Sequence, residues 1–252
     1  MQNEVILRTE NLTKRFGGIT AVDDVSFELR RGEFLGIIGP NGSGKTTLIN
    51  LITGFLKPTS GRVIYQGKDI TGKMPYTIAN LGIARSFQMV RPFYRLPAFK
   101  NIIPSLLSPR VKRLGGGKYG ERDDTAVDLL DDLGFERDSL VPYKIAGTLP
   151  HGYLKRLDLA RCMALRPELL ILDELFSGMA MSEVASTLSI IEKFSQQGLT
   201  IVMVEHRLRE LFRVADRTIV LNFGKKIADG PPHEVMKCKE VIEAYIGTEE
   251  EG

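Results

Sequence analysis

The residues in this sequence best suited to chemistry are Lys45 and Thr46, which close a short glycine-rich stretch. Its spacing is Gly-x-x-x-x-Gly-Lys-Thr, in which glycines let the backbone wrap closely, so that successive N–H groups point at phosphate oxygens. The lysine would reach the β- and γ-phosphates of a nucleotide, and the threonine hydroxyl would sit on Mg²⁺. The predicted nucleotide contacts are Gly39, Asn41, Gly42, Ser43, Gly44, Lys45, Thr46 and Thr47.

The elements predicted on either side of this stretch favour a phosphate-binding loop. The apolar run 34–38 before it is typical of a buried strand, and the amphipathic run 48–52 after it is typical of a helix. Strand, loop and helix form the context in which this motif binds phosphate, and the helix N-terminus adds partial positive charge. The alternative is a surface turn that happens to be rich in glycine. The motif alone does not identify the nucleotide.

Two adjacent acids, Asp173 and Glu174, end the apolar run 169–172, which is typical of a buried strand. A carboxylate at such a strand end can hold Mg²⁺ directly or through water, which is the role predicted for Asp173. Glu174 would point toward the γ-phosphate, where a carboxylate can orient and deprotonate the attacking water. The alternative is that the paired acids only cap the strand, and the motif upstream favours the catalytic interpretation.

Three further side chains are candidates because of their type and place. His206 follows the apolar run 200–204 and could donate a hydrogen bond to the γ-phosphate, although a lone histidine is more often structural. It could also orient Glu174 through the attacking water. Gln88 has a neutral amide that could contact Mg²⁺ or that water, whereas most glutamines are surface residues. Phe16 could stack on an adenine ring, and the alternative is a core aromatic residue.

Strands alternate with helices along most of the chain, which predicts an α/β fold with a mainly parallel sheet. In such sheets ligands bind at the carboxyl ends of the strands. Several candidates fall at or just beyond a predicted strand end, and this shared location is the strongest argument that they form one site. They are Lys45, Gln88, Asp173, Glu174 and His206.

The predicted organisation is a single domain with a nucleotide-binding core and an inserted helical subdomain. The core takes residues 1–88 and 167–252 of the domain 1–252, and the subdomain takes residues 89–166. Near the N-terminus, a run that alternates apolar and polar residues predicts a small antiparallel β element beside the core.

The composition is that of an ordinary globular chain, with 252 residues, 43% hydrophobic and 26% charged. A net charge of +3 is too small to argue for nucleic acid as a partner. Cys162 and Cys238 show no metal-ligand spacing, so we expect no disulfide framework and a reducing compartment. We see no signal-peptide pattern and no apolar run of the about 20 residues that span a bilayer, so any membrane-spanning part would come from another chain.

The order of these motifs resembles the ATP-binding subunits of ABC transporters, over essentially the whole chain. Residues 39–46 match the Walker A loop and 169–173 match Walker B. The single-residue matches are Phe16 for the aromatic loop, Gln88 for the Q-loop, Glu174 for the catalytic glutamate and His206 for the switch histidine. Within the family the chain is similar to the ATPases of branched-chain amino acid importers, through the stretches 82–88, 229–235 and 241–247.

The resemblance implies a P-loop α/β fold that binds ATP and Mg²⁺ and hydrolyses the ATP. It implies Glu174, His206 and Gln88 as catalytic residues and Thr46, Gln88 and Asp173 as metal contacts. The family works as a head-to-tail dimer on the cytoplasmic face of the membrane, bound to separate permease subunits. Hydrolysis would then drive import of a small solute, with branched-chain amino acids as the candidate.

The signature motif departs from the family pattern. Where the family usually has Leu-Ser-Gly-Gly-Gln, residues 149–153 read Leu-Pro-His-Gly-Tyr. Pro150 has neither an N–H nor a hydroxyl to offer a phosphate, and His151 replaces a glycine that lets the backbone approach. Gly152 remains as the expected contact to a partner's nucleotide. Because only the half-site lent to a partner is altered, we hypothesise that the chain pairs with a different ATPase subunit whose signature is intact.

Two smaller departures follow the paired acids, with Leu175 where the family has proline and Ala180 where it has Asp or Asn.

Two other functions therefore stay open. The chain could be a nucleotide-binding regulatory partner with little turnover of its own, although Glu174 and His206 weigh against this. It could also be a soluble ABC ATPase acting on ribosomes or DNA, although such proteins usually carry two ATPase halves or long insertions. Co-purification with membranes would separate transport from the last alternative.

Overall fold

The computed structural model describes residues 4–118 and 120–246. The chain divides into two compact units, one made of residues 1–78 and 198–252 and the other of residues 79–197. Helix α2 (Pro75–Leu81) runs across the boundary between them. Each unit has its own fully buried apolar side chains, such as Phe34 in the first and Leu157 in the second.

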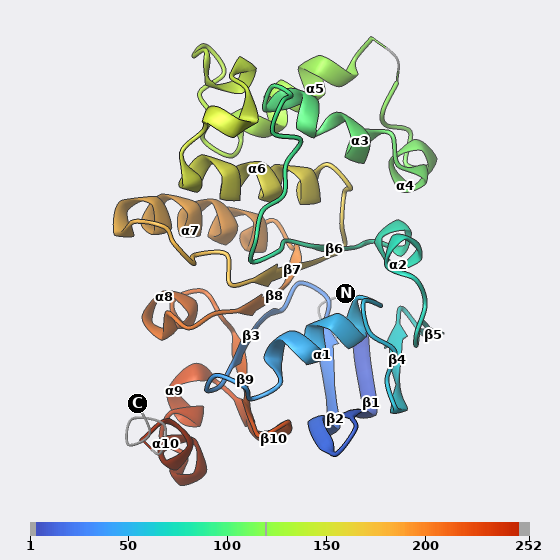
Figure 1. Cartoon of the computed structure of the whole chain (residues 1–252), viewed down its shortest axis with the longest axis vertical. Coiled ribbons are helices and arrows are strands. Elements are labelled where there is room, and N and C mark those ends of the chain that lie inside the picture. The colour runs from blue at the N-terminus through green and yellow to red at the C-terminus, as the bar shows by residue number, and fades with distance from the viewer. Residues whose placement is uncertain (1–3, 119, 247–252) are drawn as a thin grey trace. The chain divides into compact units, whose positions relative to one another are not determined.

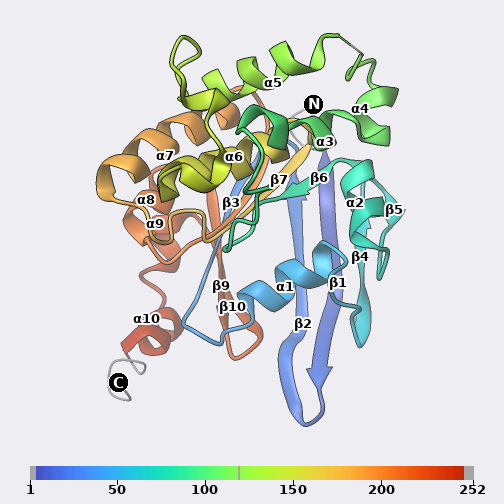
Figure 2. The same cartoon turned by 45° about the horizontal axis from the view of Figure 1, so that its top comes forward.

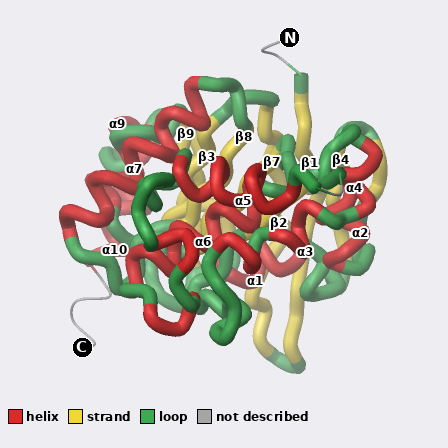
Figure 3. Tube along the Cα trace, turned by 90° about the horizontal axis from the view of Figure 1, so that it is seen from above, coloured by secondary structure: helices red, strands yellow, loops and turns green. Residues whose placement is uncertain are grey.

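The first unit contains an antiparallel sheet with the strand order β2-β1-β4-β5. Strands β1 (Val5–Phe16) and β2 (Ile19–Arg30) lie side by side as a long hairpin (Figures 2 and 3). Gly17 allows the tight turn between them because its φ of +57° is a left-handed conformation that suits glycine. Strands β4 (Ser60–Tyr65) and β5 (Lys68–Asp69) complete this sheet, which confirms the antiparallel element expected from the alternating residues.

The same unit contains a second group of strands in the order β10-β9-β3-β8. Strand β3 (Phe34–Ile38) is buried at every position, and it pairs in parallel with β8 (Thr200–Val204) and β9 (Arg217–Asn222). A strand covered on both faces needs an unbroken apolar run, which is what β3 has. Strand β10 (Lys225–Gly230) returns antiparallel to β9 through the turn 223–224.

The helices of the first unit follow its strands. Helix α1 (Lys45–Ile52) begins directly after the glycine-rich stretch, and α8 (Leu208–Phe212) follows β8. Helices α9 (Pro232–Val235) and α10 (Lys239–Ile246) close the described part of the chain. Cys238 lies half-buried just before α10.

The second unit pairs β6 (Ile83–Arg85) in parallel with β7 (Leu169–Asp173). Its two longest helices, α6 (His151–Met163) and α7 (Met181–Gln196), lie side by side (Figure 1). Smaller elements fill the segment between β6 and α6. They are α3 (Ile103–Leu106), α4 (Pro109–Arg113), α5 (Arg122–Asp131) and the 3₁₀ turns Phe99–Asn101, Val141–Tyr143 and Ala146–Thr148.

The α/β fold with parallel strands, an antiparallel element and a helical segment is confirmed. The pattern of residues 83–88 predicts a strand with Gln88 near its end, and this is corrected, because β6 ends at Arg85 and Gln88 lies three residues beyond it. The single domain 1–252 and the helical subdomain 89–166 stay predictions, and the compact units have different limits, at 78/79 and 197/198. Within residues 4–118 and 120–246 we find no helix with the length and apolar character needed to cross a bilayer.

Candidate nucleotide site

The glycine-rich loop is shaped by backbone conformations that require glycine. Gly39, Gly42 and Gly44 have φ values of +150°, +77° and +102°. A Cβ at Gly39 would lie 2.1 Å from the Leu221 carbonyl oxygen, and one at Gly44 would lie 2.3 Å from the Ala21 carbonyl oxygen. Neighbouring backbone therefore packs directly against the loop at two positions, and the loop is held in a fixed, close-wrapped form.

Lys45 opens α1 and is only 5% exposed. Its Nζ donates to the carbonyl oxygens of Gly39 at 2.7 Å and Pro40 at 2.9 Å, and it lies 3.5 Å from Ser43 Oγ. The ammonium is thus folded onto the loop that precedes it. The first turn of α1 contains no acidic residue and its N-cap glycine offers no side-chain cap, so positive charge gathers in this loop. Such a cradle fits a phosphate group.

Two elements from the end of the described chain brace the loop. The N–H of Gly224, in the β9–β10 turn, donates to the Ser43 carbonyl at 3.0 Å. The Tyr245 hydroxyl on α10 forms a hydrogen bond with the backbone of Gly39, and this bond lowers the pKa of Tyr245 against the larger raising effect of burial. The loop is therefore braced at both its first glycine and its serine.

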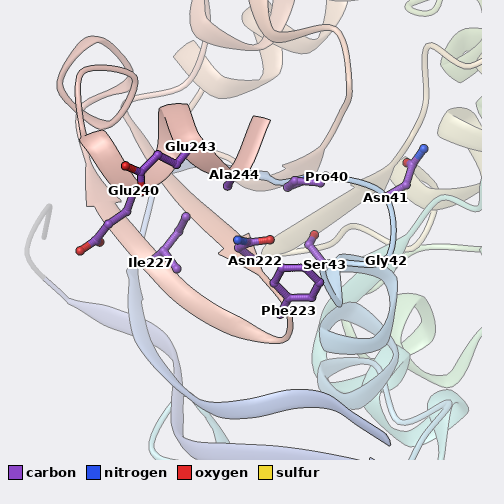
Figure 4. A pocket seen from close by; sticks show the side chains of 10 residues that line it. All are labelled: Pro40, Asn41, Gly42, Ser43, Asn222, Phe223, Ile227, Glu240, Glu243 and Ala244. Atoms are coloured by element: carbon purple, nitrogen blue, oxygen red, sulfur yellow. The ribbon is translucent and has the colours of Figure 1, made fainter. Parts of the chain in front are cut away.

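A pocket of about 600 Å³ lies between this loop, the β9–β10 turn and α10 (Figure 4). Glu240 and Glu243 of α10 line it together with the exposed aromatic ring of Phe223. Two carboxylates disfavour a polyphosphate in this pocket, so the loop's own N–H groups remain the place for phosphate. The full lining is Pro40, Asn41, Gly42, Ser43, Asn222, Phe223, Ile227, Glu240, Glu243 and Ala244.

The other predicted residues of the first unit lie at element ends. Thr46 and Thr47 occupy the first turn of α1, with Thr46 exposed. Phe16 ends β1 with 47% of its surface exposed, and the Lys14 ammonium lies 5.0 Å from its ring centroid. His206 is exposed two residues after the end of β8, which is the strand-end position that the sequence predicts.

In the second unit, Asp173 ends β7 and is only 3% exposed. Its Oδ2 accepts a hydrogen bond from Arg85 Nη2 at 2.7 Å, and both side chains are nearly buried. Arg85 lies on β6, the strand paired with β7, and its guanidinium stands 5.1 Å from the Phe87 ring centroid. The buried carboxylate is thus balanced by a buried cation, as buried charges require.

Glu174 and Gln88 are in direct contact. Gln88 Nε2 donates to Glu174 Oε2 at 2.7 Å. Glu174 has a φ of +48°, a left-handed conformation that is uncommon for a residue other than glycine and is often found at functional sites. The structure therefore brings together the predicted catalytic glutamate and the predicted Q-loop glutamine, directly after Asp173.

Sequence reasoning missed two residues of α6 that hold this pair. Lys155 is fully buried, and its Nζ donates to the carbonyl oxygens of Gln88 at 2.7 Å and Glu174 at 3.4 Å. Asp158 accepts a hydrogen bond from the Phe87 N–H at 3.1 Å. Burial raises the pKa of Asp158 against the lowering effects of Arg161, Phe87 and Lys155. Their signal in the sequence was a lysine and an acid three residues apart on an otherwise apolar helix face.

The altered signature motif begins α6. Pro150 is the N-cap and provides no side-chain cap, and Gly152 is the second residue of the helix. A Cβ at position 152 would lie 2.1 Å from Glu183 Oε1, so a carboxylate of α7 packs against this glycine. His151 Nε2 lies 3.2 Å from the Ser177 carbonyl oxygen. The imidazole ring of His151 therefore stands where the family usually has a glycine, and it contacts the loop that follows β7.

The fold and these residues show to which class of proteins the chain belongs. A glycine loop between a buried parallel strand and a helix, closed by a buried lysine, is the mark of a P-loop nucleotide-binding protein. The comparisons then give the family, because the family model described as ABC transporter matches residues 22–177. The chain belongs to the ABC transporter family, and it is a nucleotide-binding ATPase subunit of that family.

Curated relatives match along almost their whole length. The branched-chain amino acid transport ATP-binding protein BraF of Pseudomonas aeruginosa is 33% identical, with 96% of this chain and 98% of the relative covered. The probable branched-chain amino acid transport ATP-binding protein LivG of Methanocaldococcus jannaschii is 34% identical, with 96% and 97% covered.

Solved structures agree with these relatives. The ADP conformation of MJ1267, an ATP-binding cassette of an ABC transporter, is 34% identical with a TM-score of 0.86, covering 97% of this chain and 100% of that one. The dimeric, post-hydrolysis state of the cassette MJ0796 bound to ADP and Pi is 25% identical with a TM-score of 0.79, covering 90% and 99%. The recognition of the family and of ATPase activity from the sequence is confirmed.

Proposed function

We propose that this ATPase subunit drives import of a small solute through a separate membrane permease, and that branched-chain amino acids are the solute class. The observation that carries the catalytic part is the 2.7 Å hydrogen bond between Gln88 and Glu174 next to the buried Asp173. The solute class is supported by the names of the relatives BraF and LivG.

Each predicted residue receives a role in this proposal. Lys45 and the loop N–H groups bind the β- and γ-phosphates of ATP, and Phe16 stacks on the adenine. Glu174 acts as the base for the attacking water. His206 donates a hydrogen bond to the γ-phosphate.

Mg²⁺ would stabilise negative charge on the phosphates when bound. The hydroxyl of Thr46, the amide of Gln88 and the carboxylate of Asp173 are oxygen donors, the ligand class that Mg²⁺ prefers. Asp173 lies at the end of β7, where its Oδ2 accepts a hydrogen bond from Arg85 Nη2 at 2.7 Å.

The permease is proposed to dock on the second unit, on the peripheral, cytoplasmic side of a membrane. Segments 93–97 and 143–147 run together there, because Pro97 bridges to Ile145 and the Ala146 N–H donates to Leu96. Exposed apolar side chains gather on these two segments, which supports a protein interface. They are Phe93, Tyr94, Leu96, Tyr143 and Ile145.

The proposed partner in the dimer is a different ATPase subunit, arranged head to tail. Gly152 would contact that partner's nucleotide, but Pro150 removes a donor and the carboxylate of Glu183 lies against the glycine. A carboxylate at this helix end would repel a phosphate. The same observation favours the second candidate function, a regulatory nucleotide-binding subunit with little turnover of its own.

Steady-state ATP hydrolysis by the purified chain, over a range of protein concentration, tests these proposals beside Glu174→Gln. We expect little turnover alone and bound ATP that depends on Lys45. A homodimer as active as a mixed dimer would contradict the need for a different partner. Unchanged turnover after Pro150→Ser with His151→Gly would show that the signature is not the limiting element. Membrane association only in the presence of the permease would support the transport function.

A further inference from the structure

The most unusual buried side chain of the second unit is Lys155, in the middle of α6. It has no exposed surface, although lysine is almost never fully buried unless it is paired. Its Nζ lies 2.7 Å from the Gln88 carbonyl oxygen and 3.4 Å from the Glu174 carbonyl oxygen. One ammonium group therefore touches the backbone of both residues whose side chains are bonded to each other.

Asp158, three residues later, lies on the same face of α6 because residues i and i+3 are neighbours on a helix. It is 5% exposed, and its Oδ2 accepts the Phe87 N–H at 3.1 Å. Two consecutive residues are therefore bonded through their backbone: the N–H of Phe87 to Asp158 and the carbonyl oxygen of Gln88 to Lys155. Lys155 and Asp158 thus hold the backbone of the segment that follows β6, which ends at Arg85.

Lys155 bonds to the backbone of Gln88 and Glu174, whose side chains are the proposed catalytic pair. Gln88 Nε2 donates to Glu174 Oε2 at 2.7 Å, and Glu174 is held in a left-handed conformation with a φ of +48°. A hydrogen bond from a charged donor to each backbone carbonyl is among the stronger contacts that could hold such a geometry. Loss of the ammonium would remove its hydrogen bonds to both carbonyl oxygens, so the backbone of Gln88 and that of Glu174 would no longer be tied to the same group.

We propose that Lys155 is a positioning residue for ATP hydrolysis, which holds the Gln88 amide against the Glu174 carboxylate from the backbone side. It lies three residues after Gly152 on the same helix, so it also ties the signature end of α6 to the catalytic pair of its own chain. This inference rests on the proposed roles of Gln88 and Glu174, which it deepens.

The first experiment compares backbone hydrogen exchange in the full chain for wild type, Lys155→Met and Arg156→Met. Arg156 is a matched control, because it is a neighbouring cation on α6 that bonds Ser186 and Thr187 of α7 instead of the catalytic pair. We expect residues 86–90 to exchange about tenfold faster in Lys155→Met, the effect of losing one charged hydrogen bond, and to be unchanged in Arg156→Met. Unchanged exchange in Lys155→Met, or equal acceleration in both variants, would overturn the proposal.

The second experiment measures turnover with the ATPase partner that gives activity. We expect Lys155→Met to lower kcat about tenfold with KM for ATP changed less than about twofold, because positioning acts on the chemical step. In a Gln88→Ala background the same substitution should lower kcat less than about twofold, since the side chain it positions is gone. Full additivity of the two variants, or a loss in KM alone, would overturn the proposal. Absence of wild-type turnover would count against the proposed function. The hydrogen-exchange result would then decide on its own whether Lys155 holds the backbone of residues 86–90.

Discussion

The buried ion pair between Arg85 and Asp173 leads to a quantitative prediction about the second unit. The pair joins Nη2 and Oδ2 at 2.7 Å, and the side chains are 7% and 5% exposed. Arg85→Met would leave the buried carboxylate of Asp173 without its ion partner. Removing one partner of a buried pair destabilises by about 3–5 kcal/mol, and the lost stacking on Phe87 adds roughly 0.5–1 kcal/mol.

The double variant Arg85→Met with Asp173→Leu separates this charge effect from packing. Replacing both members of a buried pair by apolar residues of similar volume is often neutral, so we expect the double variant to lie within about 1.5 kcal/mol of wild type. The coupling of the two substitutions would then exceed about 1.5 kcal/mol. We therefore expect the double variant to be more stable than Arg85→Met alone.

The assay is urea unfolding followed by circular dichroism without nucleotide or Mg²⁺, so that no ligand contributes to stability. The slope of free energy against urea has to stay constant across the variants for the comparison to hold. A single variant within about 1 kcal/mol of wild type, or a double variant as unstable as the single one, would refute the reasoning.

Three other predictions concern the site. Gly39→Ala should abolish ATP binding because its Cβ would lie 2.1 Å from the Leu221 carbonyl oxygen. A Cβ at Gly42 meets nothing within 4 Å and adds only the backbone strain of a φ of +77°, so Gly42→Ala should weaken ATP binding less than Gly39→Ala in equilibrium titration. Glu174→Gln should keep ATP binding and lower kcat at least about 100-fold, and an active variant would remove Glu174 from the role of base. Burial raises the pKa of Asp158 in the native state. Between the unfolded pKa of about 4 and this raised pKa, the native state therefore binds more protons than the unfolded state. The contribution of Asp158 to stability falls as the pH rises through that range. Asp158→Asn should therefore gain in melting temperature relative to wild type over that range, and parallel pH curves would contradict this.

The phosphate-binding loop was predictable because its determinants are local. Three glycines and a lysine within a few residues fix the backbone, and a strand and a helix on either side give the context. The strand ends that carry Asp173 and His206 were also readable, because an apolar run followed by a polar residue marks the end of a buried strand.

The support of the proposed catalytic pair, Gln88 and Glu174, was not predictable in the same way. Lys155 and Gln88 are 67 residues apart in the chain, and Arg85 and Asp173 are 88 apart. A charged side chain has many possible partners elsewhere in the sequence, and only tertiary packing selects one. The end of β6 was missed for a related reason, since Ser86 and Phe87 extend the pattern of the strand although Phe87 bonds to Asp158 instead.

The two cysteines differ in a way that makes the molecule convenient for spectroscopy. Burial raises the pKa of the Cys162 thiol well above its ordinary range, and thiolate is the reactive form, so this residue should resist maleimides at neutral pH. Cys238 is only half-buried and immediately precedes α10, the helix whose Tyr245 bonds to Gly39. A fluorophore or spin label would therefore attach at a single native position and report how α10 responds when nucleotide fills the loop.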